Sequence, residues 1–220
     1  MKRLVGLGAG GHAKVIIDIL LQRGEYQVCG VVDPRLESKG SAILGVQVLG
    51  GDEELPRLRR EGVQYAFMGV ASLSDTGTNR DVFERARALG FEMINVVHQH
   101  ATVAPSVRMG CGNRVFAGAI VNPDTYIGDN VVINTGAIVE HDCRIEDHAQ
   151  VAPGAQLAGN VQLGEGSIVG LGAAVIQGVS IGRFSMVGAG AVVVEDVPDN
   201  VTVVGVPARP LPHASGTSAG

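Results

Sequence analysis

Every sixth residue through the second half of the chain is aliphatic or methionine. A period of six matches neither the repeat of an α-helix, about 3.6 residues, nor the alternation of an ordinary strand. It is the period of a parallel β-helix, in which each hexad forms one short strand and one corner. The run stops at Asp199, and its members are Val103, Met109, Val115, Val121, Ile127, Ile133, Val139, Ile145, Val151, Leu157, Leu163, Val169, Val175, Ile181, Val187 and Val193.

The residue four places after each aliphatic is small or β-branched in most hexads, and a glycine often follows the aliphatic directly, as at Gly110 and Gly128. We expect the large side chain to point inward, the small one to fill the remaining space, and the glycine to give the backbone freedom at the corner. Three hexads would close one triangular coil, and coils would stack about 4.8 Å apart. Aromatic residues make up only 4% of the chain, which suits a narrow interior. Since the period never slips, no long loop should project from this prism.

The first half of the chain has the pattern of a small parallel sheet with helices. A strand is expected over Arg3–Leu7 and a helix over Gly11–Arg23, with a glycine-rich turn between them. Gly6, Gly8 and Gly11 satisfy G-x-G-x-x-G, a motif whose helix N-terminus suits a phosphate or diphosphate. A second strand ends at Asp33, where nucleotide-binding folds place a ribose-binding acid. The alternative is that these glycines only permit tight packing of strand against helix.

Two further strands, within 63–70 and 91–97, flank a helix over 79–90. The result is a Rossmann-like sheet of about four strands, large enough for one nucleotide but too small for a dinucleotide. The predicted organisation is a Rossmann-like domain over 1–98, a β-helix domain over 99–210, and a disordered tail over 211–220.

Charge and composition exclude several classes of protein. The net charge of −5 argues against a general nucleic-acid or anionic-membrane surface. No apolar run reaches the roughly 20 residues of a membrane span, and the start of the chain lacks the apolar core of a secretory signal. The three cysteines, an odd number without CxxC spacing, are typical of free thiols in a reducing cytoplasm.

The stretch "AIVEHDCRIE" places a histidine between two carboxylates, inside a hexad region that otherwise resembles core. His141 is two places after the inward Val139, so its ring should point outward, and Gly159, one coil further on, has no side chain to cover it. Histidine suits general-base chemistry near neutral pH. A neighbouring carboxylate, from Asp142 or Glu140, would orient the ring.

A corner of the prism has almost no side chains, in the column Asn134, Ala152, Gly170 and Gly188. Bare backbone along such a corner would let a long, thin ligand lie in a groove and hydrogen-bond to main-chain groups. The pantetheine arm of coenzyme A has this shape. We therefore expect a cofactor groove along this column.

The hexads, the "EHD" of 140–142 and the "VVGVPARP" of 203–210 resemble the hexapeptide-repeat acyltransferases with a left-handed β-helix. With its N-terminal half, the chain to about residue 210 is similar to the group of sialic-acid O-acetyltransferases, bacillosamine N-acetyltransferases and GDP-perosamine N-acetyltransferases. This resemblance implies acetyl-CoA as co-substrate, no metal, a nucleotide-linked sugar as substrate, and a place in polysaccharide biosynthesis. It also implies a homotrimer in which His141 of one chain faces the N-terminal domain of the next.

The resemblance assigns roles to individual residues. It selects Asp142 as the partner of His141, and it places Asn134 near the acetyl or amino group. The residues implied to bind the nucleotide sugar are Gly10, Gly11, His12, Asp33, Pro34 and Gly69. Those implied to bind acetyl-CoA are Gln150, Gly159, Leu171 and Ala189.

The chain departs from the family pattern at two positions. The family often has a second Asp where Pro34 stands, and some relatives have a histidine in place of Gln150. His148, two residues before Gln150, is out of register to replace it. Arg209 would meet a coenzyme A phosphate or remain solvated, and His12 would contact ligand or cap its turn as an exposed polar residue.

The sequence leaves more than one acceptor of the acetyl group open. An amino group on a UDP- or GDP-linked deoxysugar, such as perosamine, is our first expectation, and a hydroxyl of a sialic acid or another sugar is the alternative. A zinc-dependent carbonic anhydrase of the same fold is a weaker rival, since His141 and His148 lack the required spacing. The last alternative is a nucleotide-binding regulator with the prism as an oligomerisation stalk.

Overall fold

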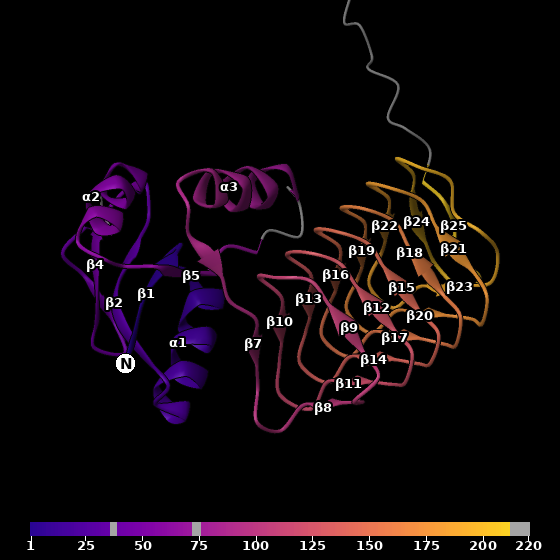
Figure 1. The fold of residues 1–220 in the computed structure, drawn as a ribbon. Coiled ribbons are helices and arrows are strands. Elements are labelled where there is room, and N and C mark those ends of the chain that lie inside the picture. The colour runs from indigo at the N-terminus through magenta and orange to yellow at the C-terminus, as the bar shows by residue number, and fades with distance from the viewer. Residues whose placement is uncertain (36–38, 72–75, 212–220) are drawn as a thin grey trace, which may run out of the picture.

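The structure, a computed structural model, describes residues 1–35, 39–71 and 76–211. These residues form two lobes that lie side by side (Figure 1). The N-terminal lobe is a six-stranded sheet in the order β3-β4-β2-β1-β5-β6, parallel except for β3. Its elements are β1 (Lys2–Leu7), α1 (Gly11–Arg23), β2 (Tyr26–Val32), β3 (Ala42–Ile43), β4 (Val46–Gly50), a 3-10 turn (Asp52–Glu54), α2 (Leu55–Arg60), β5 (Tyr65–Met68), α3 (Thr76–Ala88) and β6 (Glu92–Met93).

The predicted helix over Gly11–Arg23 coincides with α1, and the predicted Rossmann-like parallel sheet is confirmed. The sheet is larger than expected, because β3 and β4 add strands that the sequence pattern did not reveal. The expected strand over 91–97 is divided between the two lobes. Its first part is β6, which pairs with β5, and its second part is β7, which pairs with β10 of the prism. The chain thus leaves the first sheet a few residues before the predicted boundary at 98.

The C-terminal lobe is the expected prism, built from strands of two residues that stack in parallel. The β7 face has the order β25-β24-β22-β19-β16-β13-β10-β7, the β8 face β23-β20-β17-β14-β11-β8, and the β9 face β21-β18-β15-β12-β9. Stacked partners are 18 residues apart, and the backbone N–H of Val131 accordingly donates to Oδ1 of Asn113 in the coil before it. The strands are β7 (Val96–Val97), β8 (Thr102–Val103), β9 (Arg108–Met109), β10 (Arg114–Val115), β11 (Ile120–Val121), β12 (Tyr126–Ile127), β13 (Val132–Ile133), β14 (Ile138–Val139), β15 (Arg144–Ile145), β16 (Gln150–Val151), β17 (Gln156–Leu157), β18 (Gln162–Leu163), β19 (Ile168–Val169), β20 (Ala174–Val175), β21 (Ser180–Ile181), β22 (Met186–Val187), β23 (Val192–Val193), β24 (Thr202–Val204) and β25 (Arg209–Pro210).

Each strand from β8 to β23 ends on the aliphatic residue of its hexad, and that side chain points inward. The aliphatic column is buried from Val115 to Val193 and forms one core with the small residues between, such as Ala137 and Ala155. The first two members, Val103 and Met109, are partly buried where the prism begins. The expectation of an uninterrupted left-handed β-helix is confirmed.

The corners differ from the prediction in one respect. The left-handed backbone conformation occurs three places after the inward aliphatic, at glycines such as Gly136 and Gly154 and at Asp142. A glycine that follows the aliphatic directly has another cause. A Cβ on Gly110 would lie 2.1 Å from a carboxylate oxygen of Asp129 in the next coil, so coil stacking, and not backbone freedom, requires glycine there.

Three corners join the three faces. The first corner links the β7 face to the β8 face, the second links the β8 face to the β9 face, and the third links the β9 face back to the β7 face. Residues 134–137, 140–143 and 146–149 are the three corners of one coil.

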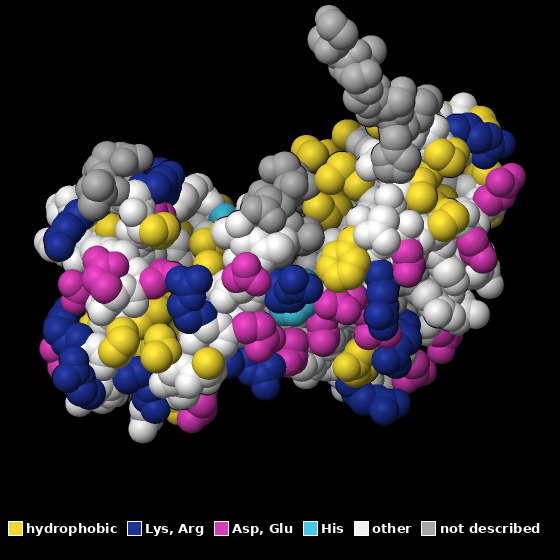
Figure 2. Space-filling model, turned by 90° about the horizontal axis from the view of Figure 1, so that it is seen from above, with side chains coloured by type: hydrophobic (Ala, Val, Ile, Leu, Met, Phe, Trp, Pro, Cys, Tyr) yellow, Lys and Arg dark blue, Asp and Glu magenta, His cyan; other side chains and the backbone are white. Residues whose placement is uncertain are grey.

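Helix α3 joins the two lobes at the third corner. Phe83 is fully buried and meets the ring of His148 edge-on, with centroids 5.7 Å apart. Arg87 pairs with Asp129 at 3.0 Å, and Arg80 lies 3.9 Å from Glu165. Basic and acidic side chains therefore meet along the junction (Figure 2).

Candidate active site

The second corner carries the predicted catalytic pair. Asp142 has a φ of 59°, a left-handed conformation that Asp adopts more readily than most residues. Its Oδ2 lies 2.7 Å from Nδ1 of His141, and the two side chains are 59% and 55% exposed. Glu140 instead accepts a hydrogen bond at 2.9 Å from Asn122, one coil earlier. The structure thus places Asp142, rather than Glu140, against the imidazole.

The contact between His141 and Asp142 selects one tautomer of the ring. A neutral imidazole that donates from Nδ1 to a carboxylate presents Nε2 as an acceptor. The same carboxylate would stabilise the imidazolium after Nε2 takes a proton. The pair has the geometry of an oriented general base.

Gly159 lies beside the imidazole, as its place one coil further on predicts. A Cβ added to Gly159 would lie 2.7 Å from Cε1 and 2.8 Å from Nε2 of His141. These distances are too short for carbon, so any side chain at position 159 would displace the ring. Glycine at this position leaves room for the imidazole in the orientation that contacts Asp142.

The other residues assigned to acetyl-CoA lie elsewhere on the prism. Leu171 and Ala189, with Asn134 below them, occupy the first corner, at the opposite edge of the β8 face from His141. Leu171 and Ala189 are exposed. Asn134 accepts the backbone N–H of Thr135 at 2.8 Å through Oδ1, which leaves its Nδ2 to donate. One chain does not bring these residues to His141.

The two glycines of the first-corner column lie against the next coil. A Cβ on Gly170 would lie 2.6 Å from the carbonyl oxygen of Val187, and one on Gly188 would lie 2.6 Å from a methyl of Val204. Both glycines therefore face the next coil, where they allow close stacking. The exposed surface of this corner belongs to the residue after each glycine, Leu171 and Ala189.

Gln150 and His148 also lie away from His141. Gln150 is on the β7 face and is only 3% exposed. His148 is at the third corner, where its Nδ1 lies 3.0 Å from Nδ2 of Asn130. Burial lowers the pKa of His148, so this ring is a neutral part of the lobe junction.

A cavity of about 340 Å³ opens in the N-terminal lobe, at the carboxyl ends of β1, β2 and β5. This is the edge at which parallel α/β sheets bind nucleotides. The six residues assigned to the nucleotide sugar all line it, namely Gly10, Gly11, His12, Asp33, Pro34 and Gly69. Asn134, assigned to the acetyl or amino group of the substrates, lies on the prism.

The glycines of this pocket serve two different needs. A Cβ on Gly6 would lie 2.3 Å from the ring of Phe67, and one on Gly69 would lie 2.9 Å from the carbonyl oxygens of Leu7 and Gly8. These two positions allow tight packing. In contrast, a Cβ on Gly10 or Gly11 would meet nothing within 4 Å, so at the start of α1 the bare backbone faces the pocket.

Asp33 closes one side of the pocket as a fixed carboxylate. Oδ2 accepts the backbone N–H of Ala9 at 2.8 Å, and both oxygens accept from the Arg35 guanidinium at 2.8 Å. The bond from Arg35, with further bonds from backbone N–H groups, lowers the pKa of Asp33 to about 2. The sequence analysis did not predict the role of Arg35. Its position two residues after Asp33 could have indicated an ion pair with that acid.

His12 forms the inner wall of the pocket and is not the exposed cap that was one expectation. Its ring meets Phe116 of the prism edge-on, with centroids 4.9 Å apart. Burial, aided by the charge of Arg114, lowers the pKa of His12 to about 3. The ring is therefore neutral at physiological pH. Arg114 was also missed, because an arginine in an outward hexad slot gives no sign that another lobe covers it.

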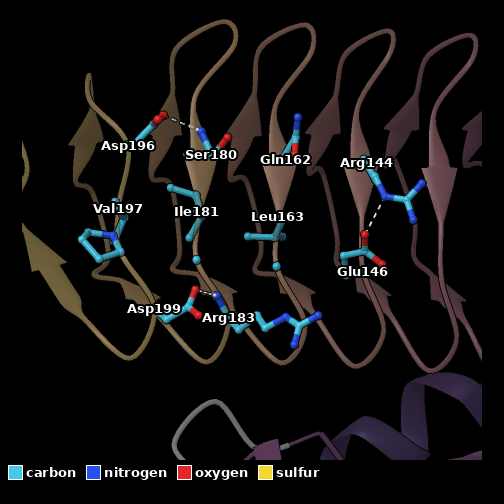
Figure 3. A pocket seen from close by; sticks show the side chains of 13 residues that line it. Arg144, Glu146, Gln162, Leu163, Ser180, Ile181, Arg183, Asp196, Val197 and Asp199 are labelled. Atoms are coloured by element: carbon cyan, nitrogen blue, oxygen red, sulfur yellow. Dashed lines mark hydrogen bonds and ion pairs between the residues drawn. The ribbon is translucent and has the colours of Figure 1, made fainter.

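Other surfaces hold no predicted site residue. A shallow groove of about 460 Å³ on the β9 face is lined by Arg144, Gln162 and Ser180 from successive strands and by Asp196 and Asp199 (Figure 3). Arg209 bonds the carbonyl oxygen of Ala208 and lies 3.9 Å from Glu195. In the ranges that the structure describes, no three His, Cys, Asp or Glu side chains are grouped to hold a metal, and no helix has the length and apolarity to cross a membrane.

Comparison with known proteins places the chain in a family. Residues 3–74 match the PglD N-terminal domain, while the search of curated proteins gave no match. The chain is 44% identical to a histidine-to-alanine variant of GDP-perosamine N-acetyltransferase from Caulobacter crescentus, crystallised with CoA and GDP-perosamine. The match covers 95% of this chain and 96% of that one, with a TM-score of 0.89.

Two further solved structures agree. The acetyltransferase domain of PglB from Neisseria gonorrhoeae FA1090, in complex with acetyl coenzyme A, is 38% identical over 96% of this chain and 99% of that one, with a TM-score of 0.88. WeeI from Acinetobacter baumannii AYE is 25% identical over 95% of this chain and 100% of that one, with a TM-score of 0.84. This chain therefore belongs to the family of hexapeptide-repeat sugar N-acetyltransferases, in which a PglD-type domain precedes a left-handed β-helix.

Proposed function

We propose that this enzyme transfers the acetyl group of acetyl-CoA to the amino group of a nucleotide-linked amino deoxysugar, with a UDP or GDP carrier and a sugar such as perosamine. The observation that carries the proposal is the full-length match, at 44% identity, to an enzyme crystallised with CoA and GDP-perosamine. The N-terminal pocket, with six of the assigned residues in one cavity, supports it. The reaction would serve polysaccharide biosynthesis in the cytoplasm, where the free thiols Cys29, Cys111 and Cys143 remain reduced.

Each lobe binds one of the two substrates. Residues 1–98 hold the nucleotide sugar, with its diphosphate at the bare amides that open α1 and its nucleoside toward Asp33 and Pro34. Residues 99–210 hold acetyl-CoA, along Gly159 at the second corner and along Leu171 and Ala189 at the first. Gln150 lies on the adjoining β7 face. The tail assigned to 211–220 falls outside the described residues except for Leu211.

The chemistry needs a base and an oxyanion donor. The sugar amine attacks the thioester carbonyl carbon while Nε2 of His141 takes the proton that the amine loses. Asp142, 2.7 Å from Nδ1, stabilises the imidazolium. Nδ2 of Asn134 donates to the oxyanion. The tetrahedral intermediate then releases the thiolate of CoA, which takes the proton back from Nε2, and the products are an acetamido sugar and CoA.

The enzyme acts as a homotrimer. Within one chain His141 is at the second corner, whereas Asn134 and the pocket wall at Phe116 are at the first. A cyclic assembly brings unlike surfaces of neighbouring chains together, so it would join the second corner of one chain to the first corner of the next. The β8 face between these corners presents a largely apolar surface suited to that contact. Ile120, Ile138, Ala174 and Val192 lie on it around one exposed polar residue, Gln156, and exposed Ile176 lies at its edge.

The acceptor is tested by measuring CoA release from acetyl-CoA with GDP- and UDP-linked 4-amino sugars, and with sialic acid and the matching 4-hydroxy sugars as alternatives. We expect release of thiol with an amino sugar on one carrier, and mass spectrometry should show one added acetyl group on nitrogen. Turnover of the hydroxy sugars alone would make the enzyme an O-acetyltransferase and would refute the proposal.

The role of His141 is tested with His141→Ala and Asp142→Asn. His141 is exposed, so neither change should alter the melting temperature by much. General-base catalysis contributes on the order of 10²- to 10⁴-fold, and we expect the lower end for His141→Ala, because a thioester is already activated. The loss should fall on kcat and should shrink at high pH, where hydroxide can take the proton of the attacking amine in place of the imidazole. An unchanged kcat at neutral pH would remove His141 from the mechanism.

A further inference from the structure

Arg114 is a charged residue at the centre of the lobe junction. It precedes the inward Val115 on β10, so its side chain leaves the prism, but the N-terminal lobe covers it and it is only 1% exposed. Its guanidinium donates to the carbonyl oxygen of Val70 at 2.9 Å, and to the carbonyl oxygen and Oδ1 of Asn130 at 2.8 and 2.6 Å. All of these acceptors are neutral.

This cation lacks a counter-charge. None of the ion pairs found among the described residues includes Arg114, and its Nε is buried without a hydrogen-bond partner. Burial alone lowers its pKa to about 9, which still leaves the side chain charged at neutral pH. A buried charge without a partner is destabilising, so its presence calls for a compensating anion.

The position of Arg114 indicates where that anion would bind. Val70, which Arg114 holds, lines the cavity of the N-terminal lobe, and so does His12. Phe116, two residues after Arg114 and on the same side of the strand, contacts the His12 ring. Nε2 of His12 is itself buried without a partner. Arg114 thus lies directly behind the pocket wall formed by His12 and Val70.

The other charges of the pocket are already balanced. Asp33 is paired with Arg35, and Asp52 is paired with Arg85. The His12 ring carries no charge at neutral pH because its pKa is about 3. Arg114 is therefore the charge behind this pocket that no carboxylate neutralises.

We propose that Arg114 is a positioning residue for the diphosphate of the nucleotide sugar, whose negative charge compensates the buried guanidinium while Val70 and His12 form the wall between them. The inference rests on the proposed function, because it takes the nucleotide sugar as the ligand of this pocket. Arg114 acts on the diphosphate electrostatically, through the wall, and it also fixes the position of Val70 by donating to its carbonyl oxygen. Its charge should therefore favour ligands with a diphosphate over the corresponding neutral nucleosides.

The test compares the full-length wild-type protein with Arg114→Met and Arg114→Lys. Arg108→Met, the removal of an exposed arginine from the neighbouring strand β9, is the matched control for net charge. Calorimetry measures dissociation constants for GDP and guanosine, for UDP and uridine, and for CoA. The decisive quantity is the ratio of nucleoside to nucleoside-diphosphate dissociation constants within each variant, since general damage to the pocket weakens both ligands and leaves the ratio unchanged.

We expect Arg114→Met to lower this ratio about tenfold for the nucleotide that the wild type prefers, with CoA affinity unchanged. Arg114→Lys keeps the charge and should retain most of the ratio, and Arg108→Met should match the wild type. A ratio within twofold of wild type in Arg114→Met would overturn the inference. If that variant fails to fold, the lysine variant decides, and loss of the ratio there despite the retained charge would overturn it. A wild-type protein that binds neither diphosphate would refute the proposed function itself.

Discussion

Gly159 constrains the orientation of the His141 ring, because only a residue without a side chain leaves room for it. Alanine at Gly159 would place its Cβ 2.7 Å from Cε1 of the His141 ring, so the ring must rotate away from Asp142. We expect Gly159→Ala to lower kcat by about tenfold or more, because misplaced catalytic groups lose rate steeply. Steady-state kinetics on the preferred substrate, with circular dichroism to confirm the fold, measure this effect.

The matched control for that substitution is Gly178→Ala, at the same corner one coil further on. Gly178 has a φ of 75°, and a Cβ there would meet nothing within 4 Å. Its replacement should cost about 1 kcal/mol of stability and leave kcat unchanged. Equal kcat values in the two variants would show that the contact between position 159 and His141 has no catalytic consequence.

The buried His12 ring should make the free energy of unfolding depend on pH below neutrality. Its pKa is about 3 in the folded protein and near 6.5 in an unfolded chain. Between these values the unfolded state binds one more proton, so the free energy of unfolding falls as pH falls, by up to about 1.4 kcal/mol per pH unit. Above about pH 6.5 the effect vanishes.

Urea denaturation of His12→Gln between pH 7 and 4 tests this dependence. The variant should lose the share of the slope due to His12 and keep the share of His148, whose pKa burial also lowers. His100→Gln, which removes an exposed imidazole, is the control and should follow the wild type. Parallel pH profiles for His12→Gln and wild type would show that the His12 ring is not held neutral.

Single residues divide into those whose environment the repeat determines and those whose environment another lobe determines. The period of six places Val139 inside, His141 outside and Gly159 beside it, because all three environments arise within the prism. Arg114 and His12 are different, since each is buried by a segment far away in the sequence. No local pattern reveals such burial, which is why the sequence missed the first and left the second undecided.

Among the elements, α3 couples the lobes. Phe83 fills the space against the His148 ring, and Arg87 lies over the other side of Phe83, 5.5 Å from its centroid. We expect Phe83→Ala to cost about 3–5 kcal/mol, as for a large buried aromatic, and to let the N-terminal lobe unfold before the prism. Helical circular dichroism reports that lobe, since α1, α2 and α3 all belong to it.

The control for this change is Val15→Ala on the exposed side of α1, where Val15 is 45% exposed. It should shift the helical transition by well under 1 kcal/mol. The contrary result is a single cooperative transition in Phe83→Ala, with the midpoint lowered equally for the helix and strand signals. It would show that the two lobes still unfold together when the Phe83 contact is lost.

Elements were predictable in proportion to the length of their sequence pattern. The prism repeats its hexad many times, and α1 carries a full-length pattern with glycines at both ends, so both were located closely. Strand β3 has only two residues and pairs antiparallel to β4 at the edge of the sheet. Such a strand depends on its neighbours more than on its own composition, and it was missed.

In the whole molecule, the residues assigned to the active site lie in two separate places. The proposed catalytic pair lies at the second corner of the prism, and the pocket proposed for the sugar nucleotide opens against the first corner through His12 and Phe116. The sequence pattern indicated both parts, but it gives the height of a residue on the prism more directly than the corner from which it projects. The expectation that His141 of one chain faces the N-terminal domain of the next came from the family resemblance. The separation predicts that neighbouring chains complete each other's sites.

Mixed assemblies test that arrangement. One variant, His141→Ala, lacks the base, and a second, Gly10→Trp, blocks the sugar pocket, at a position where a Cβ meets nothing within 4 Å and the fold should survive. Each alone should be nearly inactive. If every site takes its base from one chain and its pocket from another, co-expression at equal levels should restore about one quarter of the wild-type kcat per chain, by random pairing in a cyclic oligomer. Sites built within single chains would restore nothing, and sedimentation or light scattering should report a trimer in every sample.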